Sequence, residues 1–316
     1  MTNPHQSDVS LAPEIKAFLA AGADAGLPQV WEAPLDVVRR NTHARIKNSG
    51  PAEHVNEIVN RFIPGKTADL PVRIYRPTEN PHAPAIVFFH GGGWVLSTLD
   101  IFDSSLSRLA NQSGATIISV FYQKAPEHPF PIPFDDCYES LLWVLSNAES
   151  LKIDPAKVGV MGDSAGGNLA SAVALKARDN GIHLAFQTLI YPCNERNFET
   201  ESYINYATGY LLTTQGMQWF WQQYVQNEAD NTNPYAAPMH AKTFKDLAPA
   251  IIITAQYDPL LSDSEKYAKL LQADGVPVVY KQFDGMIHGF FVMMAITKVA
   301  AESIDFIAQE IKKLTN

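Results

Sequence analysis

The sequence predicts an α/β fold, in which helices cover both faces of a mostly parallel β-sheet. Two observations carry this prediction. Short runs that are apolar on both faces alternate with helical segments along most of the chain, as buried parallel strands do. One of these runs breaks into glycines around a single serine and continues as an alanine-rich helix. The predicted strands cover residues 85–89, 115–121, 158–161, 186–191, 250–255 and 278–283.

The N-terminal segment, residues 1–50, is expected to be helical and to pack on the rest of the chain as part of a cap. Residues 13–20 begin with a proline and an acid, as helix starts do, and we expect Gly22 and Gly26 to end this helix. A second helix is expected over residues 34–45, which also begin with a proline. Both helices are too short to make an independent domain.

Residues 51–316 are expected to form the body of the fold. They open with two partly alternating runs, residues 55–63 and 70–77, which are typical of an antiparallel hairpin. They end with a helix whose apolar stripe includes Ile296, Ala300, Ile304, Ile307, Ile311 and Leu314.

An aromatic segment interrupts the alternation of strands and helices after the strand at 186–191. Residues 194–233 are rich in Tyr, Trp and Phe and show no strand pattern. We expect a cap insertion here, because open α/β sheets bind ligands beyond the carboxyl ends of their strands. Tyr210, Leu211 and Trp219 are candidates to contact a substrate. Ordinary core packing is the alternative for each of these side chains.

Composition narrows the class of function. The chain has 316 residues, of which 46% are hydrophobic, and a formal net charge of −9. An acidic chain with no basic run is not expected to bind nucleic acid or an anionic membrane. The first eight residues lack the basic start of a secretory signal, and no stretch reaches the ~18 apolar residues of a membrane span, so we expect a cytoplasmic protein. Cys137 and Cys193 are expected to be free thiols, as in a reducing compartment.

Ser164 is the candidate nucleophile. It lies where the apolar run 158–161 gives way to the helix-favouring segment, with Gly162 and Gly166 two residues to either side. Glycines at these positions relieve the crowding of a strained strand-to-helix turn, and the helix that follows directs its free N–H groups at the serine. The N–H of Ala165 is therefore a candidate oxyanion donor. A glycine-rich turn with an idle serine is the alternative, because the G-x-S-x-G pattern also occurs by chance.

Three glycines between His90 and Trp94 directly follow a predicted strand. Successive glycines leave backbone N–H groups unshielded, so Gly92 and Gly93 are candidates to hold an oxyanion together with Ala165. A flexible loop without a role in chemistry is the alternative. We expect His90 to brace the loop rather than to transfer protons, and Trp94 is a further candidate to contact a substrate.

His288 is the candidate general base, since it follows the last predicted strand in a glycine-containing loop. Asp258 follows the apolar strand before it and is the candidate to orient the imidazole. Its rivals are Asp263, which is expected to begin the next helix, and Asp284, which is expected at the end of the last strand. The chain order Ser, Asp, His is the one that this sheet topology produces. Asp163 is expected to organise the turn around the serine.

These motifs resemble those of the hormone-sensitive-lipase-like family of α/β-hydrolases, in particular its bacterial esterases. The resemblance rests on four stretches, which are HGGGW at 90–94, GDSAGGNLA at 162–170, YDPL at 257–260 and GMIHGF at 285–290. It implies the α/β-hydrolase fold, with a mostly parallel eight-stranded sheet and a helical cap. It also assigns Ser164 as nucleophile, His288 as base, Asp258 as its partner, and Gly92, Gly93 and Ala165 as oxyanion donors.

The resemblance implies a serine carboxylesterase that acts through an acyl-enzyme, and the aromatic cap predicts short- to medium-chain esters. The expected partner is a small-molecule ester, no cofactor and no metal site are expected, and the resemblance allows a homodimer. A small-ligand receptor on the same fold, or amidase, thioesterase or lactonase activity with the same triad, are the alternatives. Leu261 and Ser262 stand where the family often has Arg and Asp, and Gln123 and Lys124 also depart from its pattern. Substrate preference therefore does not transfer directly.

Overall fold

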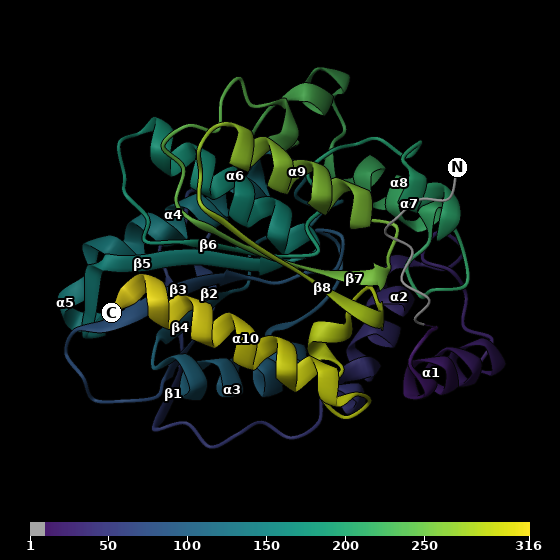
Figure 1. Ribbon diagram of the computed structural model, residues 1–316, viewed down its shortest axis with the longest axis horizontal. Helices are drawn as coiled ribbons and strands as arrows, with labels where there is room; N and C mark the ends of the chain where they lie inside the picture. Colours follow the sequence, from purple (N-terminus) through teal and green to yellow (C-terminus); the bar gives the residue numbers. More distant parts are fainter. Residues whose placement is uncertain (1–9) are drawn as a thin grey trace.

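The computed structural model describes residues 10–316, so the prediction made on the first eight residues lies outside the described part of the chain. It contains an eight-stranded sheet (Figure 1). The strands are β1 (Glu57–Ile63), β2 (Leu70–Arg76), β3 (Ala83–Phe89), β4 (Thr116–Val120), β5 (Ile153–Asp163), β6 (Gln187–Ile190), β7 (Ala250–Tyr257) and β8 (Val278–Ile287).

The sheet order is β1-β2-β4-β3-β5-β6-β7-β8. β1 pairs with β2 and β2 with β4 in antiparallel fashion, which confirms the predicted opening hairpin. All the remaining neighbours, from β4 through β8, pair in parallel. The expectation of a mostly parallel sheet is therefore confirmed, and the carboxyl ends of β3, β5, β6, β7 and β8 meet along one edge of the sheet.

Helices cover both faces of this sheet, as Figure 1 shows. On one side are α3 (Asp103–Ser113) and α10 (Lys298–Thr315), and on the other are α4 (Ile132–Ser146), α6 (Ala165–Asp179) and α9 (Leu261–Ala273); the short α5 (Ala148–Leu151) precedes β5. Side chains of β3 alternate between the two layers. Val87 and Phe89 join the apolar cluster under α4 and α6, whereas Ile86 and Phe88 join the cluster under α3 and α10. All four are completely buried, which explains why this strand is apolar at every position.

Further helices gather at the end of the sheet to which the arrows of β5 and β7 point in Figure 1. Before β1 lie α1 (Pro13–Asp24), α2 (Leu35–His43) and the 3₁₀ turn η1 (Ala44–Asn48). Between β6 and β7 lie α7 (Glu201–Asn205), α8 (Thr214–Tyr224), η3 (Glu228–Thr232) and η4 (Pro238–His240). The remaining 3₁₀ turns are η2 (Leu99–Phe102) and η5 (Phe290–Val292). The division into a cap, made of residues 1–50 and 194–233, and a catalytic body stays a prediction.

Among the element boundaries that differ from the sequence prediction, two have a clear physical reason. Gly22 lies inside α1, and only Gly26, with a φ of +58°, lies beyond its end. A single glycine weakens a helix by only about 1 kcal/mol, which is too little to end it. The last strand does not stop at residue 283 but continues to Ile287 through Gly285, whose N–H donates to Gln256 Oε1 at 2.7 Å. Asp284 is therefore inside β8 rather than after it.

The cysteines and the helix lengths bear on two further predictions. Cys137 and Cys193 are buried free thiols, as expected. Of the helices in the described part of the chain, none combines the length and the apolar character that a bilayer crossing requires.

Candidate active site

Ser164 lies in the turn between β5 and α6. Its backbone has a φ of +54° and a ψ of −120°, a strained conformation for a residue with a side chain. The flanking glycines are required by contact. A Cβ atom at Gly162 would overlap the backbone of Gly166, and one at Gly166 would overlap the carbonyl oxygen of Phe89. Glycine at both positions therefore lets this turn pack against the end of β3.

The structure brings Ser164 together with His288 and Asp258, although 124 residues separate the serine from the histidine. His288 Nε2 lies 2.9 Å from Ser164 Oγ, and His288 Nδ1 lies 2.7 Å from Asp258 Oδ2. The second oxygen of Asp258 accepts the N–H of Leu260 at 2.8 Å, so this fully buried carboxylate has a partner on each oxygen. The rivals lie elsewhere: Asp263 is in the first turn of α9, and Asp284 binds Gln282.

A tyrosine that the sequence did not single out packs against this histidine. The Tyr191 ring lies 4.6 Å from the His288 ring, centroid to centroid, and is completely buried. Tyr191 directly follows β6, and its φ of +36° is unusual for tyrosine. It therefore restricts the imidazole from the side of β6. In the sequence, the signal that could have identified Tyr191 was its position at the end of a predicted strand, beside the aromatic segment.

The loop after β3, Gly91 to Thr98, lies beside Ser164; we call it the glycine loop. In the described part of the chain, the N–H groups of Gly92, Gly93 and Ala165 donate to no protein acceptor, so they are free for a ligand oxygen. The N–H of Gly91 is used, because it donates to Asp163 Oδ1 at 2.7 Å. Only glycine fits at position 91, since a Cβ atom there would overlap the Asp163 carboxylate.

Asp163 therefore does more than organise the serine turn, which was its expected role. It connects that turn to the glycine loop through the Gly91 N–H. Burial raises the pKa of the Asp163 carboxyl from 3.8 to about 7, and this effect outweighs the opposing Gly91 hydrogen bond and the charge of His288. Asp163 is thus a buried acid of the site whose charge changes near neutral pH.

His90 has the bracing role that the sequence predicted. Its ring is completely buried, stacks on Tyr122 at a centroid distance of 4.4 Å, and has its Nδ1 atom 2.8 Å from the Gly91 carbonyl oxygen. The Tyr122 hydroxyl donates to the His90 carbonyl at 2.7 Å. Burial lowers the pKa of His90 to about 3, so the ring is neutral and unsuited to proton transfer near neutral pH.

Comparison with known proteins identifies the chain. A family model described as the alpha/beta hydrolase fold matches residues 86–292. The chain belongs to this family. The arylesterase of Saccharolobus solfataricus is 33% identical over 281 residues, which cover 89% of this chain and 92% of that protein. The ethyl acetate hydrolase of Pseudomonas putida is 32% identical over 316 residues, which cover 96% of this chain and 99% of that protein.

The solved structures agree. An esterase from the archaeon Pyrobaculum calidifontis is 37% identical, with a TM-score of 0.91, over 96% of this chain and 99% of that one. These relatives place the chain among the hormone-sensitive-lipase-like α/β-hydrolases, as the motifs indicated, and they confirm the predicted fold class.

The candidate substrate contacts of this α/β-hydrolase lie in different environments. The prediction that Trp94 contacts a substrate is wrong. Its indole is completely buried and stacks on Tyr224 at a centroid distance of 4.3 Å, so it supports the loop from within the core and offers no surface to a substrate. Tyr210, Leu211 and Trp219 are half-buried and stay candidates. The ring of Tyr210 stacks on Tyr257, the residue before Asp258, at 5.3 Å.

Phe220 of α8 packs directly against the glycine loop. A Cβ atom at Gly93 would overlap its ring. Phe220 is 7% exposed and has its ring centroid 5.2 Å from that of Trp219. The aromatic run of the insertion was the only signal for it, and that run did not distinguish Phe220 from its neighbours.

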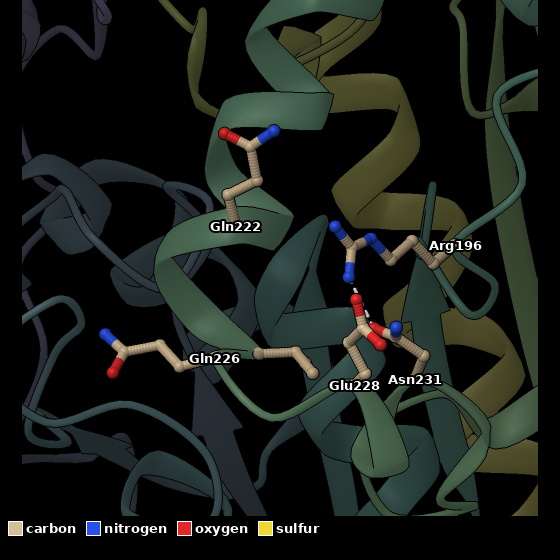
Figure 2. Close-up of a pocket in the computed structure, with 6 residues that line it drawn as sticks. Arg196, Gln222, Gln226, Glu228 and Asn231 are labelled. Carbon is tan, nitrogen blue, oxygen red and sulfur yellow. Dashed lines mark hydrogen bonds between the residues drawn. The ribbon is translucent and has the colours of Figure 1, made fainter.

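A surface cavity of about 460 Å³ lies between α8, η3 and the segment after β6 (Figure 2). Its lining consists of Arg196, Gln222, Val225, Gln226, Glu228 and Asn231. Arg196 donates to Asn231, and in Figure 2 these two residues and Glu228 converge whereas both glutamine amides point away from them. None of the catalytic candidates lines this polar cavity, so it is separate from the site at Ser164.

Proposed function

We propose that this α/β-hydrolase is a serine carboxylesterase, with Ser164, His288 and Asp258 as its triad. The single observation that carries the proposal is the chain of two hydrogen bonds from Ser164 Oγ through His288 to Asp258, at 2.9 and 2.7 Å, beside unused backbone N–H groups. The relatives named as arylesterase and ethyl acetate hydrolase support the same activity.

In the proposed reaction, Ser164 Oγ attacks the ester carbonyl carbon while His288 Nε2 takes the hydroxyl proton. Asp258 holds the imidazole with its Nδ1 proton toward the carboxylate and stabilises the imidazolium that forms. The tetrahedral oxyanion accepts hydrogen bonds from the N–H groups of Gly92, Gly93 and Ala165. His288 returns the proton to the departing alcohol, which leaves an acyl group on Ser164, and a water activated by His288 then releases the carboxylic acid.

The enclosure of the site supports short- to medium-chain esters as substrates. Ser164 is only 6% exposed, the His288 side chain is 11% exposed, and Phe220 of the insertion packs against Gly93. A nucleophile this enclosed suits a small ester better than the surface of a lipid aggregate. Tyr210, Leu211 and Trp219 would contact the substrate in this proposal.

We place the protein in the cytoplasm and propose that it forms a homodimer. The buried free thiols Cys137 and Cys193 suit a reducing compartment. β8 is an edge strand of the sheet, and the partly exposed apolar side chains of Val279 and Leu314 support a contact with a second copy there.

Ser164→Ala tests the proposed function. With p-nitrophenyl butyrate as substrate, we expect kcat to fall by at least about 10⁴-fold, because the attacking oxygen is lost. Ser150→Ala, which removes an exposed hydroxyl on α5, is the matched control and should keep wild-type activity. A Ser164→Ala protein as fast as wild type would disprove the proposal. A wild-type protein that binds esters stoichiometrically without turnover would instead identify a receptor.

A further inference from the structure

The backbone of the glycine loop is strained, so its conformation depends on contacts with other parts of the chain. Gly92, Gly93, Trp94 and Ser97 have φ values of +112°, +61°, +60° and +79°. Two of these residues carry side chains, and such conformations cost on the order of 1–3 kcal/mol each unless the surroundings impose them. Gly92, whose carbonyl accepts the N–H groups of Val95 and Leu96, closes one internal turn. The other contacts of the loop come from elsewhere in the chain.

Arg39 of α2 supplies one of these external contacts. Its Nε atom donates to the Val95 carbonyl at 3.0 Å and its Nη2 atom to the Ala125 carbonyl at 3.1 Å. Ala125 in turn donates its N–H to the Trp94 carbonyl at 3.0 Å. The guanidinium therefore binds the glycine loop and the 122–127 segment together, in each case one peptide beyond the hydrogen bond that joins them directly.

The orientation of this guanidinium is fixed by a carboxylate. Arg39 donates to both oxygens of Glu127, at 2.6 and 2.8 Å. The Arg39 side chain is 29% exposed and that of Glu127 is 49% exposed, so the ion pair itself contributes little stability. Its effect is geometric, because a two-point contact with a planar group leaves Nε and Nη2 directed at the two carbonyls.

Two more side chains hold the far end of the loop. Lys124 Nζ donates to the Ser97 carbonyl at 2.7 Å, and His43 Nδ1 lies 3.2 Å from Thr98 Oγ1. Burial, and next the charge of Arg39, lower the pKa of Lys124 to about 8. Arg39 and His43 both belong to α2, so one face of this helix contacts the glycine loop at two separate points.

We propose that Arg39 is a positioning residue for catalysis, which holds the Val95 peptide so that the N–H groups of Gly92 and Gly93 face the reacting oxygen. The helix α2 thereby does more than cover the site: it sets the geometry of the oxyanion donors. The inference rests on the proposed ester hydrolysis. Because these donors act on the tetrahedral oxyanion, losing Arg39 lowers kcat and leaves KM nearly unchanged.

Arg39→Ala, Arg39→Lys and the control Arg40→Ala test this inference. Arg40 lies on the same helix, but it is exposed, and within residues 10–316 its side chain pairs only with Asp36, one turn away. With p-nitrophenyl butyrate, we expect Arg39→Ala to lower kcat by about 10- to 100-fold, as a misplacement near 1 Å does. KM should change by less than about threefold, and the pH profile of kcat should keep its shape, because the triad is untouched. Arg40→Ala should match wild type.

Arg39→Lys separates geometry from charge. Lysine keeps the positive charge but lacks the planar group that makes four hydrogen bonds here, two of them to Glu127, so we expect its kcat to fall nearly as far as that of Arg39→Ala. If Arg39→Ala does not fold, the kcat of Arg39→Lys tests the inference in its place. Added guanidinium at millimolar concentration should restore part of the kcat of Arg39→Ala and leave that of Arg40→Ala unchanged.

The inference is overturned if a folded Arg39 variant keeps at least half of the wild-type kcat, or if its loss appears in KM instead. It is also overturned if Arg40→Ala loses as much activity as Arg39→Ala. These results differ from failure of the proposed function, in which wild-type protein would itself have no esterase activity.

Discussion

The serine turn and the glycine loop meet at the same sheet edge, but they are held in different ways. The turn around Ser164 is determined by its own sequence, because Gly162 and Gly166 are the contacts that let it pack against Phe89. The glycine loop has comparable backbone strain, yet it is held by residues distant in sequence, among them Asp163 and Arg39. A short motif can therefore encode the turn of a candidate nucleophile by its own glycines, whereas the loop of the candidate oxyanion donors depends on contacts with distant residues.

Gly166→Ala should have the largest effect of the substitutions that probe this contrast. The added methyl group would overlap the Phe89 carbonyl, a backbone atom that cannot move aside without separating the turn from β3. We expect the free energy of unfolding to fall by about 3 kcal/mol or more, and little activity to remain. Urea denaturation followed by circular dichroism measures the loss.

Gly22→Ala is the matched control for this substitution. Gly22 is exposed within α1 and has open space where a Cβ atom would lie, so alanine should leave activity unchanged and stabilise the protein by a few tenths of a kcal/mol to about 1 kcal/mol. If Gly166→Ala were as stable as Gly22→Ala, the turn would not be held by its glycines.

Asp163→Asn should have an intermediate effect, visible as a change in pH dependence. Burial raises the pKa of Asp163 from 3.8 to about 7, so between these values the folded protein holds a proton that the unfolded chain has released. The stability that this proton contributes is complete below pH 3.8 and is lost as the pH rises through 7. The slope for one such group reaches at most about 1.4 kcal/mol per pH unit.

Asparagine can still accept the Gly91 N–H, but it does not titrate. We therefore expect Asp163→Asn to lack this part of the slope and to gain stability relative to wild type between pH 5 and pH 8, the range that urea denaturation would cover. Identical slopes in the two proteins would show that Asp163 is ionised throughout this range.

Tyr122→Phe should have the smallest effect. The variant keeps the ring that stacks on His90 and loses only the hydroxyl that donates to the His90 carbonyl at 2.7 Å. The free energy of unfolding should fall by about 1 kcal/mol, as for one buried hydrogen bond, and kcat by only a few-fold. Thermal denaturation and kcat, measured on the same preparation, check both values. A loss of activity as large as that expected for Arg39→Ala would show that the loop depends on His90 more than on α2.

The sequence predicted the parts of the molecule that depend on local patterns. The alternation of apolar runs predicted the sheet, and the glycines around Ser164 predicted the strained turn, because steric crowding acts within a few residues. It also identified His288 and Asp258 from their places after two strands, and the structure brings both to Ser164, whereas their catalytic roles stay predictions.

What the sequence could not predict depends on contacts between distant segments. Trp94 stands beside the glycines as a substrate contact would, but only its stacking on Tyr224 shows that it is core. β8 continues past residue 283 because Gln256 of the adjacent strand accepts the Gly285 N–H, a pairing that no local pattern shows. Arg39 belongs to no motif, since it binds two backbone carbonyls and one carboxylate, that of Glu127, 88 positions away in the sequence.

Because Arg39 binds backbone carbonyls, its contacts matter for chimeras made by exchanging segments between related enzymes. A junction at residue 50 would replace the N-terminal helices together with Arg39, whereas the carbonyls of Val95 and Ala125 exist whatever residues occupy those positions. A donor segment should therefore be compatible when it presents an arginine at this point, even if its remaining sequence differs. The contact between a transplanted N-terminal segment and its host can then be judged from two side chains, this arginine and the carboxylate at position 127 that orients it.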